Sequence, residues 1–161
     1  VEARLKSLKD ELVPENREFQ LGPLLEDCRR QMAKKLPALK IVLDCRDDLR
    51  LKSDPELLAS VFENLLLNAF ESGGEGICVR LGVRQDEQSR QAVIEVADNG
   101  PGIPPDLLPE GLFEPFKTSK DGGSGIGLWQ AKRIMASLGG GITAENMEDG
   151  GAKFVVRLPL D

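Results

Sequence analysis

The sequence predicts an α+β fold in which helices cover one face of a mixed or antiparallel sheet. Segments with helical periodicity alternate with strand-like segments, and no βαβ rhythm joins them. The strand-like segments in the second half of the chain come in pairs, joined by polar or glycine-rich turns. The chain has 161 residues, 40% of them apolar, which is enough for one domain with a sizeable core.

The first segment is expected to be the end of a helix that enters the domain. Apolar residues recur at helical spacing from Val1 to Leu12, with lysine and glutamate between them, and Pro14 stops the pattern. We therefore expect residues 1–14 to be the tail of an amphipathic or coiled-coil helix and residues 15–161 to form the domain. Because the helical pattern is already present at Val1, we interpret the chain as a piece of a longer protein, with any membrane segment of that protein outside it.

A short strand, a helix and a strand pair are expected next. The strand is predicted near residues 19–21, and the helix from about Leu24 to Leu36. The alternation in ALKIVLDC predicts a strand over 38–45, with residues 49–52 as its short partner.

The longest helix is predicted from Pro55 to about Ser72. Ser53 or Asp54 would cap it, proline suits its first position, and the glycines that start at Gly73 would end it.

The remaining half is predicted to contain two hairpins, a loop and a helix. Strands are predicted over 77–84, 91–98, 141–146 and 152–159. A helix is predicted between the two hairpins, over about 125–138. Residues 106–124 hold three glycines and two prolines among polar residues, so we expect a loop with only short helical turns and little core to bury.

The composition disfavours several classes of protein. The formal net charge of −6 is spread along the chain, whereas a nucleic-acid-binding protein needs a basic surface. Backbone amides can still bind a small anion without lysine or arginine. The three cysteines lie in separate segments without metal-ligand spacing, so we interpret them as reduced thiols of a cytoplasmic protein.

Two asparagines interrupt the helix predicted after Pro55. Asn64 and Asn68 are four residues apart, so their amides share a face of the helix. An unpaired amide in apolar surroundings costs about 1–3 kcal/mol, so both need partners. They are either structural amides that cap neighbouring loops, or an oxygen ligand for Mg²⁺ together with a contact to phosphate or water.

Three further segments carry candidate chemistry. In VADNGPGIP, Asp98 could accept a hydrogen bond from an exocyclic amine, and the glycines would let the backbone approach a flat ring, although Asp-Asn-Gly is also an ordinary turn. In GGSGIGLWQAKRI, a glycine-rich loop enters a helix whose free amides suit a polyphosphate, unless the loop is a ligand-free hinge. LFEPFKTSKDGG combines two phenylalanines with hydroxyl groups and Lys120, and by itself could be a hydrophobic anchor for a surface loop.

In this order, ENLLLNA, DNGPGIP, LFEPF and GSGIGL resemble the N, G1, F and G2 boxes of the histidine kinase catalytic domain. The resemblance covers roughly residues 19–160 and implies the ATP-binding (Bergerat) fold shared with gyrase B, heat-shock chaperone and mismatch-repair ATPases. That fold is a two-layer α/β sandwich with a mixed, mostly antiparallel sheet of about five strands, about three helices on one face and an ATP lid loop. The implied cofactors are ATP and Mg²⁺.

The resemblance assigns roles to the residues that bind the metal and the base. Asn68 would ligate Mg²⁺, and Asn64 would support it or contact the phosphates. Asp98 would bind the adenine amino group. The pocket around the base would be formed by Gly100, Gly102 and Ile103.

The lid and the phosphate site are assigned in the same way. Phe113 and Phe116 would anchor the lid. The phosphates would be bordered and cradled by Thr118, Ser119, Lys120, Gly123, Ser124, Gly125, Ile126, Gly127 and Leu128. Asn64 and Lys120 are the candidates for a catalytic role.

Three positions depart from the pattern of the family. Glu71 stands where many relatives carry lysine or arginine, so charge neutralisation at the phosphates would fall more to Lys120. Ala152 replaces a threonine found near the adenine, which puts one water-mediated contact to the base in doubt. Lys117 replaces the hydrophobic residue that often follows the second phenylalanine.

Other activities occur on the same fold. The related ATPases place a general-base glutamate four residues before the metal-binding asparagine, where this chain has Asn64. Glu63, one position earlier, would point about 140° away from Asn68 and is poorly aimed at a γ-phosphate. A serine kinase that acts on an anti-sigma antagonist is a further alternative, disfavoured by the leading amphipathic helix. A non-catalytic binding module is disfavoured by the intact boxes.

The chain contains no histidine. Histidine kinases phosphorylate a histidine on a separate helical dimerisation domain, so the acceptor would lie outside this chain, in a homodimeric parent protein. The final acceptor would be an aspartate on the receiver domain of a response regulator. Catalysis by this chain would consist of positioning the γ-phosphate of ATP and offsetting its charge with Mg²⁺ and loop amides, which leaves ADP.

Overall fold

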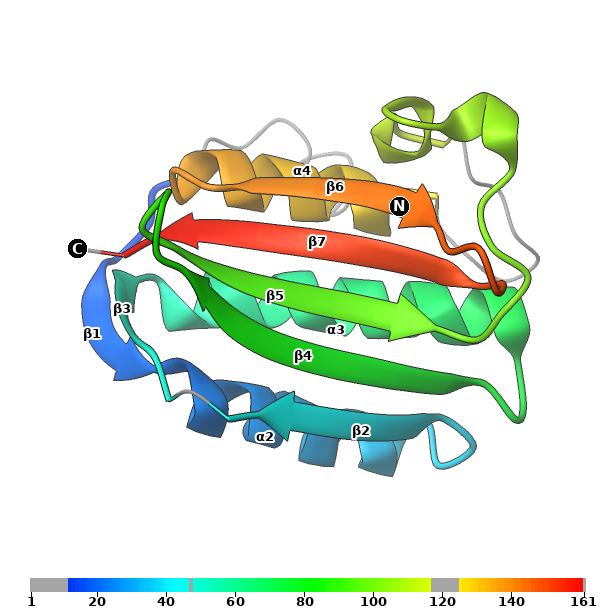
Figure 1. Cartoon of the computed structure of the whole chain (residues 1–161), viewed down its shortest axis with the longest axis horizontal. Coiled ribbons are helices and arrows are strands. Elements are labelled where there is room, and N and C mark those ends of the chain that lie inside the picture. Colours follow the sequence, from blue (N-terminus) through cyan, green and yellow to red (C-terminus); the bar gives the residue numbers. More distant parts are fainter. Residues whose placement is uncertain (1–11, 47, 117–124, 161) are drawn as a thin grey trace.

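The computed structural model describes residues 12–46, 48–116 and 125–160 of the chain. The main sheet has five strands in the order β2-β4-β5-β7-β6 (Figure 1). These strands are β2 (Lys40–Cys45), β4 (Cys78–Asp86), β5 (Gln91–Asp98), β6 (Gly141–Asn146) and β7 (Ala152–Pro159). β2 runs parallel to β4, and the other neighbouring strands are antiparallel. The prediction of a mixed, mostly antiparallel sheet of about five strands is confirmed.

A second, small sheet corrects one predicted pairing. β3 (Arg50–Ser53) pairs antiparallel with β1 (Arg17–Gln20), so the expectation that residues 49–52 pair with the strand over 38–45 is wrong. The Leu21 amide donates to the Leu49 carbonyl oxygen at 2.9 Å, which holds the two segments together where β1 ends. Leu51, opposite Phe19 in this pair, is almost fully buried. β2 pairs instead with β4, across a connection that contains a helix, as parallel strands require.

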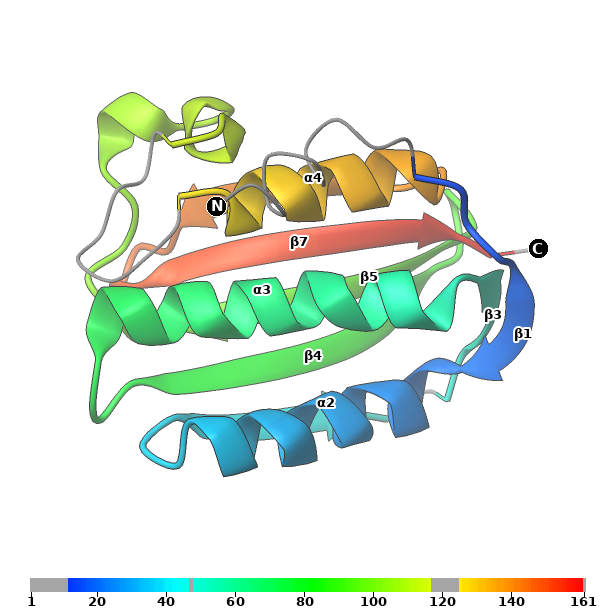
Figure 2. The ribbon, with the colours of Figure 1, turned by 180° about the vertical axis from the view of Figure 1, so that it is seen from behind.

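The helices α2 (Leu21–Lys35), α3 (Pro55–Gly73) and α4 (Gly127–Ser137) cover one face of the main sheet (Figure 2). α2 begins directly after β1, three residues before the predicted start at Leu24. Two short 3-10 helices, η1 (Pro105–Leu107) and η2 (Gly111–Phe113), interrupt the loop after β5, as expected. Among the described helices, none combines the length and the apolar character needed to cross a membrane. The helix expected over residues 1–14 lies almost entirely outside the described residues.

α3 begins where the sequence predicts. Oδ1 of Asp54 accepts hydrogen bonds from the amides of Glu56 and Leu57, both at 3.1 Å, and Pro55 takes the first helical position. The helix lies between α2 and α4 in Figure 2 and contacts both. Its buried residues are Leu58, Val61, Phe62, Leu65, Leu66 and Ala69. Because α3 is covered from several sides, its apolar residues occupy most of its circumference.

The three cysteines form no disulfide with one another. Cys28 of α2 is buried, and its Sγ lies 4.0 Å from the Ala59 carbonyl oxygen of α3. Burial, with a contribution from the negative charge of Glu63, raises the pKa of this thiol to about 12. Cys28 therefore stays protonated near neutral pH and packs as a small apolar side chain.

Candidate functional site

One end of the sandwich brings together the C-terminal ends of α3 and β5 and the start of β7 (Figure 1). Asp98, the last residue of β5, is only 8% exposed there. Its Oδ1 accepts hydrogen bonds from the Gly100 amide at 2.9 Å and from the Ala152 amide at 3.2 Å. No other residue in the described part of the chain donates a hydrogen bond to this carboxylate. Oδ2 is therefore available to accept a hydrogen bond from a ligand.

The loop after Asp98 is shaped by glycine and proline. Gly102 has φ +85°, a conformation that favours glycine, and a Cβ at this position would lie 2.8 Å from Oδ1 of Asn146. Oδ1 of Asn99 accepts a hydrogen bond from the Cys78 amide at 2.8 Å, which ties the loop to the start of β4. The conformation of this loop therefore depends on glycine at position 102.

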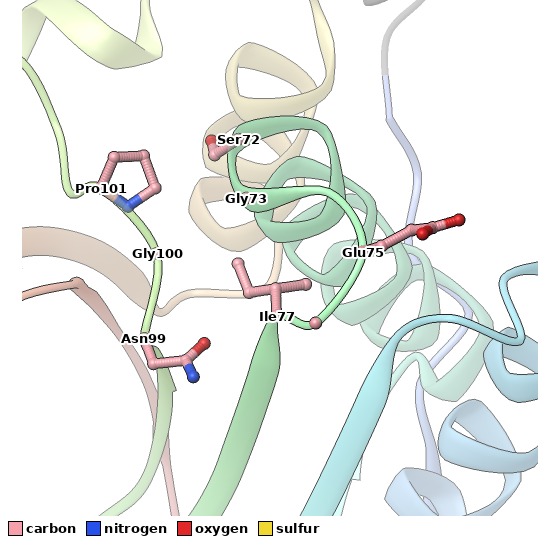
Figure 3. Close-up of a pocket in the computed structure, with 8 residues that line it drawn as sticks. Ser72, Gly73, Glu75, Ile77, Asn99, Gly100 and Pro101 are labelled. Atoms are coloured by element: carbon pink, nitrogen blue, oxygen red, sulfur yellow. The ribbon is translucent and has the colours of Figure 1, made fainter.

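Two adjoining pockets separate this loop from the end of α3. The first, of about 440 Å³, is lined by Glu71, Ser72, Pro101, Gly102, Ile103, Pro104 and Pro105. The second, of about 330 Å³, is lined by Ser72, Gly73, Glu75, Gly76, Ile77, Asn99, Gly100 and Pro101 (Figure 3). In Figure 3, Ile77 lies between the loop at Asn99–Pro101 and the end of α3. Ser72 and Pro101 line both pockets, so the two hollows meet between them.

The two asparagines of α3 are half-buried. A Cβ built at Gly127 would lie 3.8 Å from Cγ and from Oδ1 of Asn64, so Asn64 is directed toward the start of α4. Glu63 is rotated by about 100° from Asn64 around the helix, and its charge acts on Cys28 of α2. Of these two neighbouring residues, Asn64 is therefore the one that faces the start of α4.

The start of α4 is suited to a negative charge. Its N-cap residue, Ile126, makes no side-chain hydrogen bond to the helix, and no acidic residue lies in the first turn. The first amides of a helix carry partial positive charge and lack partners within the helix. The side chains of Ile126 and Leu128 are buried and are not exposed to a ligand. Of the remaining residues expected at the phosphates or beside them, Lys117, Thr118, Ser119, Lys120, Gly123 and Ser124 lie outside the described residues.

The first half of the expected lid is anchored to the core. Leu112 and Phe113 are 1% and 4% exposed, which contradicts the expectation that this half buries little core. The Phe113 ring lies edge-on to Phe154 of β7, with the centroids 6.3 Å apart. The Lys132 ammonium group of α4 lies 4.9 Å from the centre of the Phe113 ring and pairs with Glu110.

Phe116 differs from Phe113 and corrects the prediction that both anchor the lid. Its side chain is 60% exposed, and its φ is +65°. The Phe116 amide donates to the Gly125 carbonyl oxygen at 2.7 Å. This backbone hydrogen bond holds Phe116 beside the segment before α4. The Phe116 side chain is exposed to solvent and does not pack in the core.

The sequence pointed to Ala152 near the base, but not to Asn146 and Gly151 on either side of the turn between β6 and β7. The Ala152 amide holds Asp98, and Asn146 contacts the loop at Ile103. Gly151 lies so close to the end of β5 that a Cβ there would come within 1.9 Å of the Asp98 carbonyl oxygen. An asparagine at a strand end and a double glycine are the only signals in the sequence, and both are common in ordinary turns.

A nearly buried carboxylate beside adjoining pockets, together with a helix start that has no acidic residue in its first turn, suits a polar ligand that carries negative charge. Residues 53–161 match the family described as histidine kinase-, DNA gyrase B- and HSP90-like ATPases. The chain belongs to this family. Within it, the relatives most similar to the chain include sensor kinases of two-component systems.

The signal transduction histidine-protein kinase AfsQ2 of Streptomyces coelicolor is 41% identical over 123 residues, which is 74% of this chain. The sensor protein TorS of Escherichia coli is 33% identical over 148 residues, or 88% of the chain. The chain spans 22% and 16% of the lengths of these two proteins.

Solved structures with the same fold include two larger kinase structures. The histidine kinase ThkA, in complex with the response regulator protein TrrA, has a TM-score of 0.81 and 26% identity, covering 99% of this chain and 46% of that one. Full-length ShkA in complex with AMPPNP has a TM-score of 0.78 and 26% identity, covering 98% and 33% of the two chains.

Gly151→Ala is expected to destabilise the protein more than Gly150→Ala. Both glycines have positive φ, +86° and +101°, so alanine costs about 1–2 kcal/mol at either position. Only at Gly151 would the new Cβ collide with the Asp98 backbone, which adds about 1–3 kcal/mol. Urea unfolding followed by Trp129 fluorescence measures both variants, and equal losses would contradict the close packing of this turn against Asp98.

Proposed function

We propose that this chain is the ATP-binding catalytic domain of a sensor histidine kinase. It binds Mg-ATP and presents the γ-phosphate to a histidine on a separate dimerisation domain, from which the phosphoryl group passes to an aspartate of a response regulator. The observation that favours a kinase over a hydrolase is the orientation of α3. Asn64 occupies the side of the helix that faces the start of α4, and the neighbouring carboxylate of Glu63 is directed toward α2.

Adenine recognition is assigned to Asp98. A carboxylate whose Oδ1 is already held by two backbone amides has a fixed orientation, so Oδ2 can accept a hydrogen bond from the adenine amino group without losing side-chain freedom on binding. Gly100, Gly102 and Ile103 form the wall beside it. The AMPPNP complex of ShkA, which has the same fold, supports a nucleotide as the ligand.

The phosphates and the metal are assigned to the opposite part of the site. The amides at the start of α4, from Gly125 to Leu128, would contact the phosphates, and Asn68 would supply an oxygen ligand to Mg²⁺. When bound, Mg²⁺ offsets negative charge on the transferring phosphoryl group. Asn64 supports the metal or the phosphates from the same face of α3. Thr118, Ser119, Lys120, Gly123 and Ser124 complete the proposed phosphate site.

In the described part of the chain, α3 offers no general base for water on the side that faces the start of α4. A hydrolase needs a general base within hydrogen-bond reach of the attacking water, and an asparagine amide at position 64 cannot accept that proton. The nucleophile of the proposed reaction is instead the imidazole of the acceptor histidine on another domain. The kinase names of the relatives and the ThkA–TrrA complex support this assignment.

The proposed partners follow from the reaction. Residues 1–14 are proposed to be the end of the dimerisation helix and residues 15–161 the catalytic domain of a homodimeric parent protein. The receiver domain of a response regulator is the proposed downstream partner. The compartment proposed for this domain is the cytoplasm, where ATP is available.

Asp98→Asn is expected to weaken ATP binding by about 1.5–3 kcal/mol, because it removes the charge on the acceptor of the adenine amine. Glu95→Gln is the matched control: it removes a carboxylate from the same strand, 3.6 Å from Arg84, at a position that points to the opposite face of the sheet from Asp98. Calorimetric titration should show unchanged affinity for this control. Equal binding of ATP and GTP by the unchanged protein would contradict the role of Asp98.

Asn68→Ala is expected to weaken Mg-ATP binding at least about tenfold more than it weakens binding of metal-free ATP, because the lost group is a metal ligand. Titrations with Mg²⁺ and with EDTA measure the two affinities. Asn16→Ala, at an exposed position, controls for loss of an amide. Losses of the same size in both titrations would remove Asn68 from the metal site.

Phosphotransfer tests the proposed function itself. With ATP labelled at the γ-phosphate, the chain alone is expected neither to label itself nor to release phosphate quickly, because it has no histidine. When the parent protein's dimerisation domain is supplied as a separate piece, that domain should gain an acid-labile, base-stable label. Transfer should be slow, because the tether that raises the effective concentration is missing. Rapid phosphate release by the chain alone, with no transfer, would instead establish an ATPase.

A further inference from the structure

The side chain of Asn146 is bonded to the backbone of a residue 43 positions away. Its Oδ1 accepts a hydrogen bond from the Ile103 amide at 2.7 Å, and its Nδ2 donates to the Ile103 carbonyl oxygen at 2.8 Å. The carboxamide therefore pairs with Ile103 as a neighbouring strand would, with one donor and one acceptor on each side. Only asparagine has both groups on a side chain this short.

These two bonds are the only hydrogen bonds made by the backbone of residues 101–103 within the described part of the chain. Pro101 and Pro104 have no amide hydrogen to offer, so this stretch has few means of attachment. Ile103 packs against the edge of the core, but apolar contacts do not set the position of a backbone as hydrogen bonds do. The position of Ile103 therefore depends on Asn146.

The approach of the amide also explains the residue before Ile103. A Cβ on residue 102 would lie 2.8 Å from Oδ1 of Asn146, closer than side chains normally pack. Glycine at 102 is thus required by its φ of +85° and by the carboxamide beside it.

Asn146 and Ala152 are directly opposite each other at the last pair of β6 and β7 before the turn. The Ala152 amide holds Oδ1 of Asp98, and the Asn146 side chain holds Ile103. The turn between them is closed by the Met147 amide, which donates to the Gly151 carbonyl oxygen at 3.0 Å. One strand pair therefore sets the separation of the two groups assigned to the adenine ring, the carboxylate and the apolar wall.

We propose that Asn146 is a positioning residue of the nucleotide site, which holds Ile103 at the distance from Asp98 that an adenine ring requires. This inference rests on the proposed function, because it concerns the same site. Its effect is on recognition of the base and not of the phosphates, which are assigned to the start of α4. Loss of the Asn146 carboxamide removes both hydrogen bonds to the Ile103 backbone and lowers selectivity for adenine.

The test compares Asn146→Ala and Asn146→Asp with the unchanged protein. Dissociation constants of Mg-ATP and Mg-GTP are measured by displacement of a fluorescent ADP analogue. GTP carries the same triphosphate but lacks the amine from which Asp98 would accept a hydrogen bond. The position of Ile103 should therefore contribute little to the affinity for GTP. Asn146→Ala should weaken ATP about tenfold, as for two lost hydrogen bonds, and GTP less than about threefold. Asn146→Asp keeps an acceptor for the Ile103 amide and should show an intermediate loss of ATP affinity.

Asp86→Ala is the control for a lost hydrogen-bond acceptor at a turn far from the site. Oδ1 of Asp86 accepts from the amides of Gln88 at 3.2 Å and Ser89 at 3.5 Å, in the hairpin at the other end of β5. This variant should leave the ratio of ATP to GTP affinity unchanged, even if its melting temperature falls.

The outcomes separate this inference from the proposed function. Failure of the unchanged protein to bind Mg-ATP would overturn both. If the unchanged protein binds ATP, then equal losses of ATP and GTP affinity in Asn146→Ala, or no loss, would overturn the positioning role alone. If Asn146→Ala does not fold, the same ratio measured for Asn146→Asp decides, and an unchanged ratio there overturns the inference.

Discussion

The burial of α3 between the sheet and its two neighbouring helices is the interaction on which the rest of the structure depends. Six of its residues are at most 3% exposed, and burying each large apolar side chain contributes about 1.5–3 kcal/mol. A helix covered on so many sides has little room for polar groups, so the orientation of those it carries is strongly determined. Asn64 meets the start of α4, and Glu63 falls on the flank toward α2. Packing of the core thus decides which polar side chain meets the start of α4.

The carboxylate of Asp98 depends on a second constraint, which comes from the sheet. A nearly buried charge is costly unless hydrogen bonds hold it, and here one donor comes from the loop after β5 and the other from the start of β7. The donors are backbone amides, so the arrangement depends on the register of β5 and β7 and not on particular side chains. The replacement of threonine by alanine at position 152, a departure from the family pattern, leaves the amide contact intact.

The two constraints together explain why the same fold can serve different reactions. In the proposed site, the sheet would supply the carboxylate that binds the base, and the helical layer would supply the polar groups near the phosphates. In the proposed site, residue 64 of α3 belongs to the part assigned to the phosphates, separate from Asp98 at the end of β5. The proposed transfer to a histidine elsewhere therefore needs no general base in this chain, only a nucleotide held with its γ-phosphate accessible.

The local sequence determined most of the helices and strands of this protein and its family. Periodicity located the helices and hairpins, Asp54 and Pro55 marked the start of α3, and the order of the four boxes indicated the family, because these signals act between residues close in the chain. The partner of β3, the exposure of Phe116 beside a buried Phe113, and the bond from Asn146 to Ile103 were decided only by the tertiary structure. Alternating residues show that a segment is a strand but not which strand it pairs with. Likewise, neither a phenylalanine nor an asparagine specifies its partner, because contacts between residues far apart in the chain depend on how the whole core packs.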